Sequence, residues 1–201
     1  MKKRTATVKR KTKETGISVK LCLDGSGENA IKTGIAFLDH MLSLFAFHGL
    51  FDLDIKVSEQ DLDVDIHHTN EDVGISLGEA FRKALGAKSQ IKRFGDAEVP
   101  MDEAVAKVVL DISGRGSFNF IPPKQAYSFV TDGEGYNLDD AKEFLKSFAS
   151  NAGITLTCEI SRGENLHHSL EAAFKAFGRA LREACEIDPR KKGIPSTKGR
   201  L

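Results

Sequence analysis

The chain has 201 residues, of which 40% are hydrophobic and 29% charged, so it has enough apolar material to form a folded core. Lys plus Arg equals Asp plus Glu at 29 each, a balance that argues against a nucleic-acid or anionic-membrane partner. No apolar run approaches the ~20 residues of a membrane span, and the basic first residues are not followed by an apolar signal segment. We therefore expect a cytoplasmic protein that acts on a small molecule.

Patterns in the first half predict strands and helices in turn. The first forty residues alternate between apolar and polar side chains as strands do, for example at residues 16–23, which the turn sequence 24–27 follows. Apolar residues at three- and four-residue steps then predict a helix from Gly34 to Gly49. Residues 51–57 alternate as another strand, and a second amphipathic helix is predicted up to a stop at Gly86.

The second half repeats this order. Residues 104–112 and 154–160 are predicted strands, and residues 141–148 and 170–185 are predicted helices. Between them, residues 121–135 contain two prolines and several glycines, which favours a loop or a loosely paired edge. Strands and helices in both halves indicate an α+β fold.

A sequence motif marks the two halves as copies of one unit. Residues 67–71 read His-His-Thr-Asn-Glu and residues 167–171 read His-His-Ser-Leu-Glu, 100 residues apart, and each segment opens an amphipathic helix. This spacing indicates a duplicated α+β unit. No Ser/Gly-rich linker stands near residue 95, so we expect the halves to pack as one body. The predicted divisions are a first repeat at 1–95, a second repeat at 96–190 and a C-terminal tail at 191–201.

The motif has the spacing of a metal site. Residues i and i+4 of a helix share a face, whereas adjacent residues diverge by about 100°. His67 and Glu71 can therefore face one ion while His68 points elsewhere, and the second motif repeats the arrangement. Four imidazoles and two carboxylates exceed the needs of one tetrahedral ion, so we expect two ions. Nitrogen and oxygen ligands without thiolate suit Mn, Fe or Zn, and the spacing alone does not choose among them.

Five segments of the chain resemble, in the same order, the signature blocks of the imidazoleglycerol-phosphate dehydratase family. They are residues 37–42, 67–72, 111–115, 167–171 and 194–199. The resemblance implies a duplicated fold of the ribosomal-protein-S5-domain-2-like type, with helices on one face of each sheet. It also implies trimers that assemble into a homo-oligomer of 24 subunits, with two Mn2+ ions per active site at subunit interfaces.

The same resemblance implies the metal ligands. They are the two motifs and two further helix positions, which gives His40, His67, His68, Glu71, Glu143, His167, His168 and Glu171. The family carries histidine at both further positions, and here Glu143 takes the second place. A carboxylate can still bind manganese through oxygen. Thr157 is another departure, since many members have histidine there.

The resemblance further implies a hydro-lyase that dehydrates imidazoleglycerol phosphate to imidazole acetol phosphate in histidine biosynthesis. Removal of a weakly acidic C–H proton needs a proton shuttle, for which the resemblance nominates Glu14, with Asp102 as a further catalytic candidate. A phosphate group needs cations and hydrogen-bond donors. The residues nominated for it are Arg93, Arg115, Lys175, Ser196, Thr197 and Lys198.

Two other functions remain open at this point. A metal-storage cage would use the same His-Glu sites without catalysis, but it would not explain Glu14, Arg115 and Lys198. A catalytically impaired homologue is suggested by Glu143. Conversion of imidazoleglycerol phosphate by the purified protein distinguishes the dehydratase from both of these alternatives.

Overall fold

The computed structural model describes residues 3–12, 15–59, 66–123 and 135–201. Within these ranges the chain forms eight strands and four helices. The strands are β1 (Thr5–Lys11), β2 (Gly16–Cys22), β3 (Asn29–Lys32), β4 (Asp52–Glu59), β5 (Phe94–Met101), β6 (Ala104–Asp111), β7 (Ser117–Ile121) and β8 (Thr155–Arg162). The helices are α1 (Ala36–Gly49), α2 (Ile66–Leu85), α3 (Leu138–Ala152) and α4 (Leu166–Cys185).

The strands form two sheets with the same topology. The order is β1-β2-β4-β3 in the first sheet and β5-β6-β8-β7 in the second. In each sheet the first three strands pair antiparallel, and the last edge strand runs parallel to its neighbour. The matching order confirms the predicted duplicated α+β fold.

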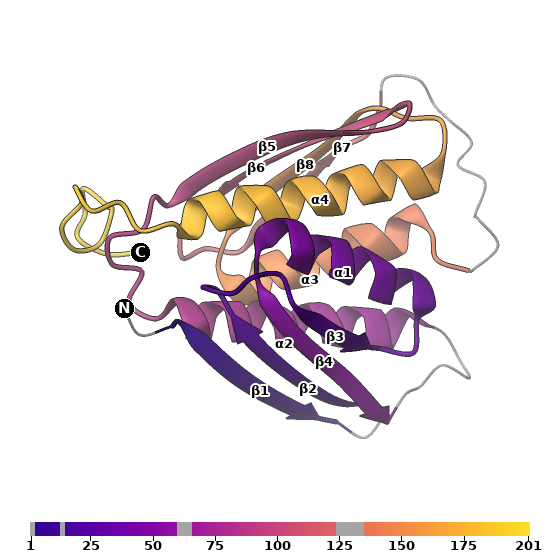
Figure 1. Ribbon diagram of the computed structural model, residues 1–201, viewed down its shortest axis with the longest axis horizontal. Helices are drawn as coiled ribbons and strands as arrows, with labels where there is room; N and C mark the ends of the chain where they lie inside the picture. Colours follow the sequence, from indigo (N-terminus) through magenta and orange to yellow (C-terminus); the bar gives the residue numbers. More distant parts are fainter. Residues whose placement is uncertain (1–2, 13–14, 60–65, 124–134) are drawn as a thin grey trace.

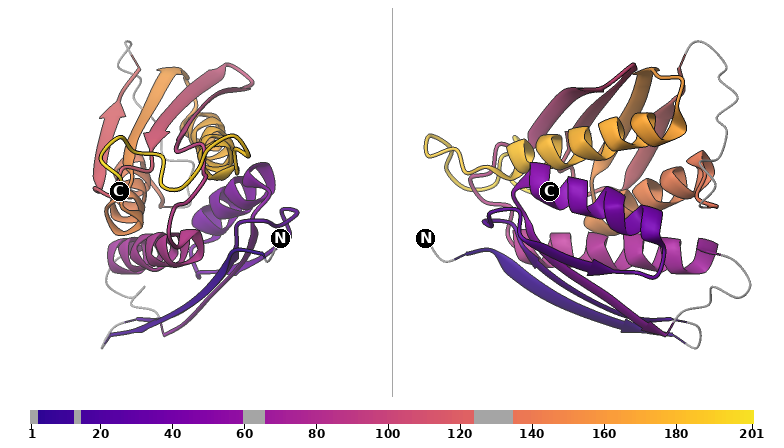
Figure 2. Two further views of the ribbon diagram at one scale, coloured as in Figure 1. Left: turned by 90° about the vertical axis from the view of Figure 1, so that its left-hand side faces the viewer. Right: turned by 45° about the vertical axis from the view of Figure 1, so that its right-hand side comes forward.

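The four helices lie between the two sheets, which form the outer layers of the molecule (Figures 1 and 2). α2 covers β1 and β2, and α4 covers β5 and β6. The helices of the two halves also pack across the middle, α1 against α4 and α2 against α3. Each half therefore completes the helical layer of the other, and the halves share one core.

Four phenylalanines, one from each helix, pack together at the centre of this layer. Phe45 and Phe148 stand on α1 and α3, and the ring centroid of Phe177 on α4 lies 4.9 Å from that of Phe45 and 5.1 Å from that of Phe148. Phe81 on α2 packs 5.7 Å from Phe148. All four side chains are almost completely buried. Aromatic pairs at this separation stabilise beyond the burial of their area.

Glycines allow the helices to approach closely. A Cβ atom on Gly178 of α4 would lie 2.4 Å from the carbonyl oxygen of Phe45, and one on Gly78 of α2 would lie 2.6 Å from that of Phe148. Gly78 and Gly178 are 100 residues apart, as the two motifs are. The close contact thus occurs twice, at equivalent places.

The predicted elements largely match the observed ones. The two motifs stand in the first turns of α2 and α4, and the predicted strands coincide with β2, β4, β6 and β8. β1 and β3 lie within the first forty residues, where strands were predicted, whereas the edge strands β5 and β7 were not predicted. β7 is short and mostly exposed, and β5 contains Pro100, so neither has the apolar pattern of a central strand. Among the described residues, no helix has the length and apolar character that a membrane span requires.

The glycine contact makes a prediction about stability. In an exposed helix, replacing glycine by alanine stabilises by about 1 kcal/mol. Gly178→Ala is expected to do the opposite, because its methyl group would meet backbone atoms of α1 that cannot move without separating the helices. We expect a loss of about 1–3 kcal/mol in the free energy of unfolding, measured by urea denaturation. Arg179→Ala, exposed on the same helix, is the control, and a neutral or stabilising Gly178→Ala would contradict the contact.

Candidate metal centre

Three potential metal ligands meet between α1 and α4. Among the described residues, donor atoms of His40, His167 and Glu171 lie within 4.8 Å of one another. Oε1 of Glu171 is 2.9 Å from Nε2 of His40 and 3.1 Å from Nε2 of His167. The contact of His167 with Glu171 follows the predicted i and i+4 spacing. His40 arrives from the other half of the chain, through the packing of α1 on α4.

Lys175 holds the other carboxylate oxygen of Glu171. Its Nζ donates to Oε2 at 2.6 Å and also lies 3.3 Å from the sulfur of Met101. Burial raises the pKa of Glu171, but the hydrogen bonds from Lys175, His40 and His167 outweigh it and lower the pKa to about 2. The carboxylate is therefore ionised at neutral pH and its charge is available to a cation.

The first motif lies at the equivalent place on α2. Nε2 of His67 is 4.0 Å from Oε2 of Glu71, and both side chains are partly exposed. Glu143 stands on α3, the helix that packs on α2. Its carboxylate accepts hydrogen bonds from Lys146 at 3.1 Å.

The internal symmetry relates Glu143 to His40. Phe45 and Phe148 make equivalent glycine contacts and are 103 residues apart, the same separation as His40 and Glu143. Each of these two ligand candidates lies five residues before its phenylalanine. Glu143 thus occupies on α3 the position that His40 occupies on α1.

His168 faces away from this cluster, as the divergence of adjacent helical residues predicts. Its Nδ1 is 2.8 Å from Oε2 of Glu103, and its Nε2 is 3.7 Å from Oδ2 of Asp102. The hydrogen bond between His168 and Glu103 raises the pKa of His168 and lowers the pKa of Glu103 to about 2. Asp102 is exposed and has φ = 48° in the turn between β5 and β6. Asp102, a catalytic candidate, therefore lies beside a motif histidine.

Glu14, the predicted proton shuttle, lies outside the described residues. The chain on either side of it in sequence is fastened to α2 next to Glu71. Asp72 accepts hydrogen bonds from the hydroxyl of Thr15 and, at 3.0 Å, from Nε of Arg10. The β1–β2 pair corresponds to the β5–β6 hairpin of the second half.

The C-terminal tail is docked beside two of the nominated phosphate-binding residues. Arg93 forms a two-point ion pair with Asp111, at 2.7 and 3.0 Å, and donates at 3.0 Å to the carbonyl of Pro195. A Cβ on Gly114, next to Arg115, would lie 2.5 Å from the carbonyl carbon of Leu201. The tail that carries Ser196, Thr197 and Lys198 is thus held at the end of the second sheet where Arg93 and Arg115 lie.

The second motif and this tail lie at opposite ends of α4. The motif stands in the first turns of the helix, while the backbone N–H of Arg93 donates to Ala184 in its last turn. A helix of 20 residues is about 30 Å long. Lys175 lies with the metal-ligand cluster, but within one chain the structure does not bring the other nominated phosphate-binding residues to it.

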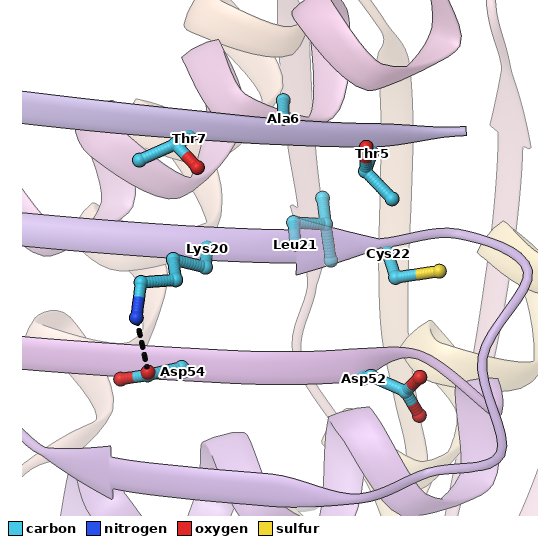
Figure 3. Close-up of a pocket in the computed structure, with 8 residues that line it drawn as sticks. All are labelled: Thr5, Ala6, Thr7, Lys20, Leu21, Cys22, Asp52 and Asp54. Atoms are coloured by element: carbon cyan, nitrogen blue, oxygen red, sulfur yellow. Dashed lines mark hydrogen bonds and ion pairs between the residues drawn. The ribbon is translucent and has the colours of Figure 1, made fainter. Parts of the chain in front are cut away.

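An open hollow of about 290 Å³ lies on the outer face of the first sheet (Figure 3). Strand residues such as Thr5, Thr7, Cys22 and Asp52 line it, and Lys20 and Asp54 are joined there by an ion pair of 3.1 Å. α2, which carries the first motif, covers the opposite, inner face of this sheet, and α4 lies on the second sheet. The hollow is therefore separate from the metal-ligand cluster.

Sequence reasoning missed Glu103. The sequence places it beside Asp102, and nothing in the charge pattern distinguishes one carboxylate from the other. The equivalence of the two hairpins is the signal that could have directed attention to both residues of this turn.

The buried setting of Glu171 makes a prediction for the metal-free protein. Side chains of Glu171 and Lys175 are only 11% and 14% exposed. Lys175→Met leaves a buried carboxylate without its cation, and we expect a loss of about 1.5–3 kcal/mol in the free energy of unfolding. The matched control is Lys83→Met, since Lys83 makes an i,i+4 pair with Glu79 at 3.7 Å that is largely exposed. That variant should lose no more than about 0.5 kcal/mol, and equal losses in urea denaturation would contradict the argument.

Comparison with known proteins agrees with this geometry. The family model described as imidazoleglycerol-phosphate dehydratase matches residues 33–181. A protein of that name from Thermoanaerobacter sp. (strain X514) is 56% identical over 198 residues, which cover 98% of this chain and 100% of the relative. One from Alcanivorax borkumensis is 51% identical over 204 residues, covering 100% of this chain and 97% of the relative.

Solved structures of the same enzyme have the same fold. The structure from Pyrococcus furiosus, in complex with (S)-C348, has a TM-score of 0.81 and 39% identity and covers 96% of this chain and 100% of that one. The structure from Staphylococcus aureus has a TM-score of 0.79 and 34% identity and covers 92% of this chain and 99% of that one. The chain therefore belongs to the imidazoleglycerol-phosphate dehydratase family.

Proposed function

We propose that the chain is a hydro-lyase that converts imidazoleglycerol phosphate to imidazole acetol phosphate in histidine biosynthesis, in the cytoplasm. The proposal includes two Mn2+ ions per active site and a homo-oligomer of 24 subunits. The observation that carries it is the meeting of His40, His167 and Glu171 between α1 and α4, in a chain of this family.

The donor set fits a divalent transition metal. On binding, a metal ion would replace the Nε2 protons through which His40 and His167 contact Glu171, whose carboxylate is held ionised by its surroundings. Two imidazoles and one carboxylate suit Mn, Fe or Zn better than Ca or Mg. The proposed second metal site has one imidazole and two carboxylates, from His67, Glu71 and Glu143. His68 and His168 complete the proposed ligands.

The chain's own residues supply proton transfer and substrate binding. A bound metal ion would act as a Lewis acid on the imidazole ring of the substrate. Glu14, with Asp102 assisting, would take the C–H proton and return a proton to the departing hydroxyl group. Arg93, Arg115, Lys175, Ser196, Thr197 and Lys198 would bind the phosphate, since cations and hydroxyl groups match its charge and acceptors.

The separation along α4 supports a site shared between copies of the chain. The tail residues and the metal ligands lie at opposite ends of a helix about 30 Å long. Imidazoleglycerol phosphate is far shorter than this distance. A phosphate on Lys198 and an imidazole ring on the metals therefore require two chains, which is why we propose a homo-oligomer.

Activity and metal content together test this function. The purified protein should convert imidazoleglycerol phosphate after Mn2+ is added and lose activity when a chelator removes the ion. His167→Ala removes one nitrogen ligand, so we expect at least a ~10-fold loss of Mn2+ affinity and a parallel loss of turnover. Metal content is measured by mass spectrometry and turnover by formation of the ketone product.

His48 provides the matched control, because it is the one histidine of six that stands outside the proposed ligand set. His48→Ala should keep metal and activity. Wild-type protein that binds Mn2+ without turning over the substrate would support the metal-storage cage or the impaired homologue instead.

Glu143 makes the two proposed metal sites chemically different. The site of His40 has one carboxylate and two imidazoles, whereas the site of Glu143 exchanges one imidazole for a carboxylate. Glu143→His is expected to make the second site resemble the first. Because imidazole favours zinc over manganese more than carboxylate does, the Zn2+ to Mn2+ selectivity should rise about tenfold.

Competition between the two ions, followed by metal analysis of the washed protein, measures this selectivity. Glu79→His, on the surface of α2, is the control for adding a histidine near the site. Unchanged selectivity in Glu143→His would remove residue 143 from the ligand set.

A further inference from the structure

Glu103 connects the β5–β6 hairpin to the beginning of α4. Its Oε1 accepts hydrogen bonds from the backbone N–H groups of Glu164, at 3.4 Å, and Asn165, at 3.0 Å. Its Oε2 lies 2.8 Å from Nδ1 of His168. Both oxygens of this one carboxylate are therefore engaged at the head of the helix that carries the second motif.

We propose that Glu103 is a positioning residue that fixes the imidazole of His168 with Nε2 as its metal-binding nitrogen. The inference rests on the proposed function, in which His168 is a metal ligand. It goes beyond that function by assigning a role to a residue outside the ligand set.

The chemistry of the contact determines which nitrogen carries the proton. An ionised carboxylate only accepts hydrogen bonds, so the neutral imidazole of His168 places its single proton on Nδ1. The lone pair then resides on Nε2, and a metal binds a histidine through its unprotonated nitrogen. A carboxylate on the second nitrogen also makes the imidazole a stronger ligand.

Neighbouring groups fix the position of the His168 ring as well as its tautomer. Asn165, the N-cap of α4, accepts a hydrogen bond from the backbone N–H of His168 at 3.2 Å. Glu103 holds the ring itself, and the backbone of Asn165 holds Glu103. His168 is thus fixed both at its backbone and at its side chain. Its Nε2 faces the side of Asp102, away from the cluster around Glu171.

The first half also attaches its hairpin to its helix through an acidic side chain. There the acidic group is Asp72 on α2, and it binds Arg10 and the hydroxyl of Thr15 of the hairpin. In the second half the acidic group stands on the hairpin, and its partner on the helix is an imidazole.

The Glu103→Gln variant distinguishes positioning of the His168 imidazole from attachment of the β5–β6 hairpin to α4. The amide oxygen can still accept from the backbone N–H groups of Glu164 and Asn165, so the hairpin stays attached. The amide NH2 group would face Nδ1 of His168 and donate to it, which moves the imidazole proton to Nε2 and blocks the metal. We expect Mn2+ affinity to fall about 10- to 100-fold, while the thermal midpoint of the metal-free protein shifts by less than ~3 °C.

Free Mn2+, followed by electron paramagnetic resonance during titration of the full-length protein, measures the affinity. Glu98→Gln on the exposed face of β5 is the matched control and should bind Mn2+ as the wild type does. Unchanged affinity in Glu103→Gln, with His168→Ala weakened, would overturn the positioning role and leave the metal site intact.

His168→Ala and the double variant complete the test. A residue that acts through His168 has no further effect once the imidazole is gone, so Glu103→Gln/His168→Ala should match His168→Ala. An additional loss in the double variant would show that Glu103 acts by another route and would overturn the proposal. Wild-type affinity in His168→Ala would instead reject His168 as a ligand, and with it both the proposed ligand set and this inference.

Discussion

The packing of α1 against α4 is the contact on which the candidate metal centre depends. His40 belongs to the first half and His167 and Glu171 to the second, and they meet because α1 lies across the middle of the molecule. The approach is close because Gly178 has no side chain to hold the helices apart. Ligand geometry is therefore fixed by the shared core of both halves, and neither half could build the site alone.

Duplication places the proposed ligands of the two halves at equivalent helix positions, with different donor atoms. The glycine contacts place His40 and Glu143 at equivalent positions, so the backbone supports are alike while the donor atoms differ. The nearby cations also differ. Lys175 is buried against Glu171, whereas Lys146 is largely exposed beside Glu143. A buried cation opposes a bound metal ion more strongly than an exposed one, so the two places differ in both ligand type and local charge.

Local sequence patterns predicted the features that depend on a single helix or strand. They did not predict the features that depend on contacts between two such elements. The i and i+4 spacing predicted that His167 and Glu171 share a face and that His168 diverges, because helical geometry alone determines this. The spacing could not show that His40 joins the second motif and not the first, since the crossing of α1 onto α4 is a tertiary contact. The resemblance named His40 but not its partners. Glu103 was missed for the same reason, because its role depends on a hairpin reaching the head of a distant helix.

The length of α4 connects the chemistry to assembly. α4 packs on β5 and β6, and as a helix of 20 residues it holds its two ends about 30 Å apart. At one end stand the motif and Glu103. At the other, the pairing of Arg93 with Asp111 and Pro195 holds the tail with Lys198. If both ends act on one small substrate, as proposed, each chain must combine its metal ligands with the tail of a neighbouring chain, and an isolated chain would have no complete active site.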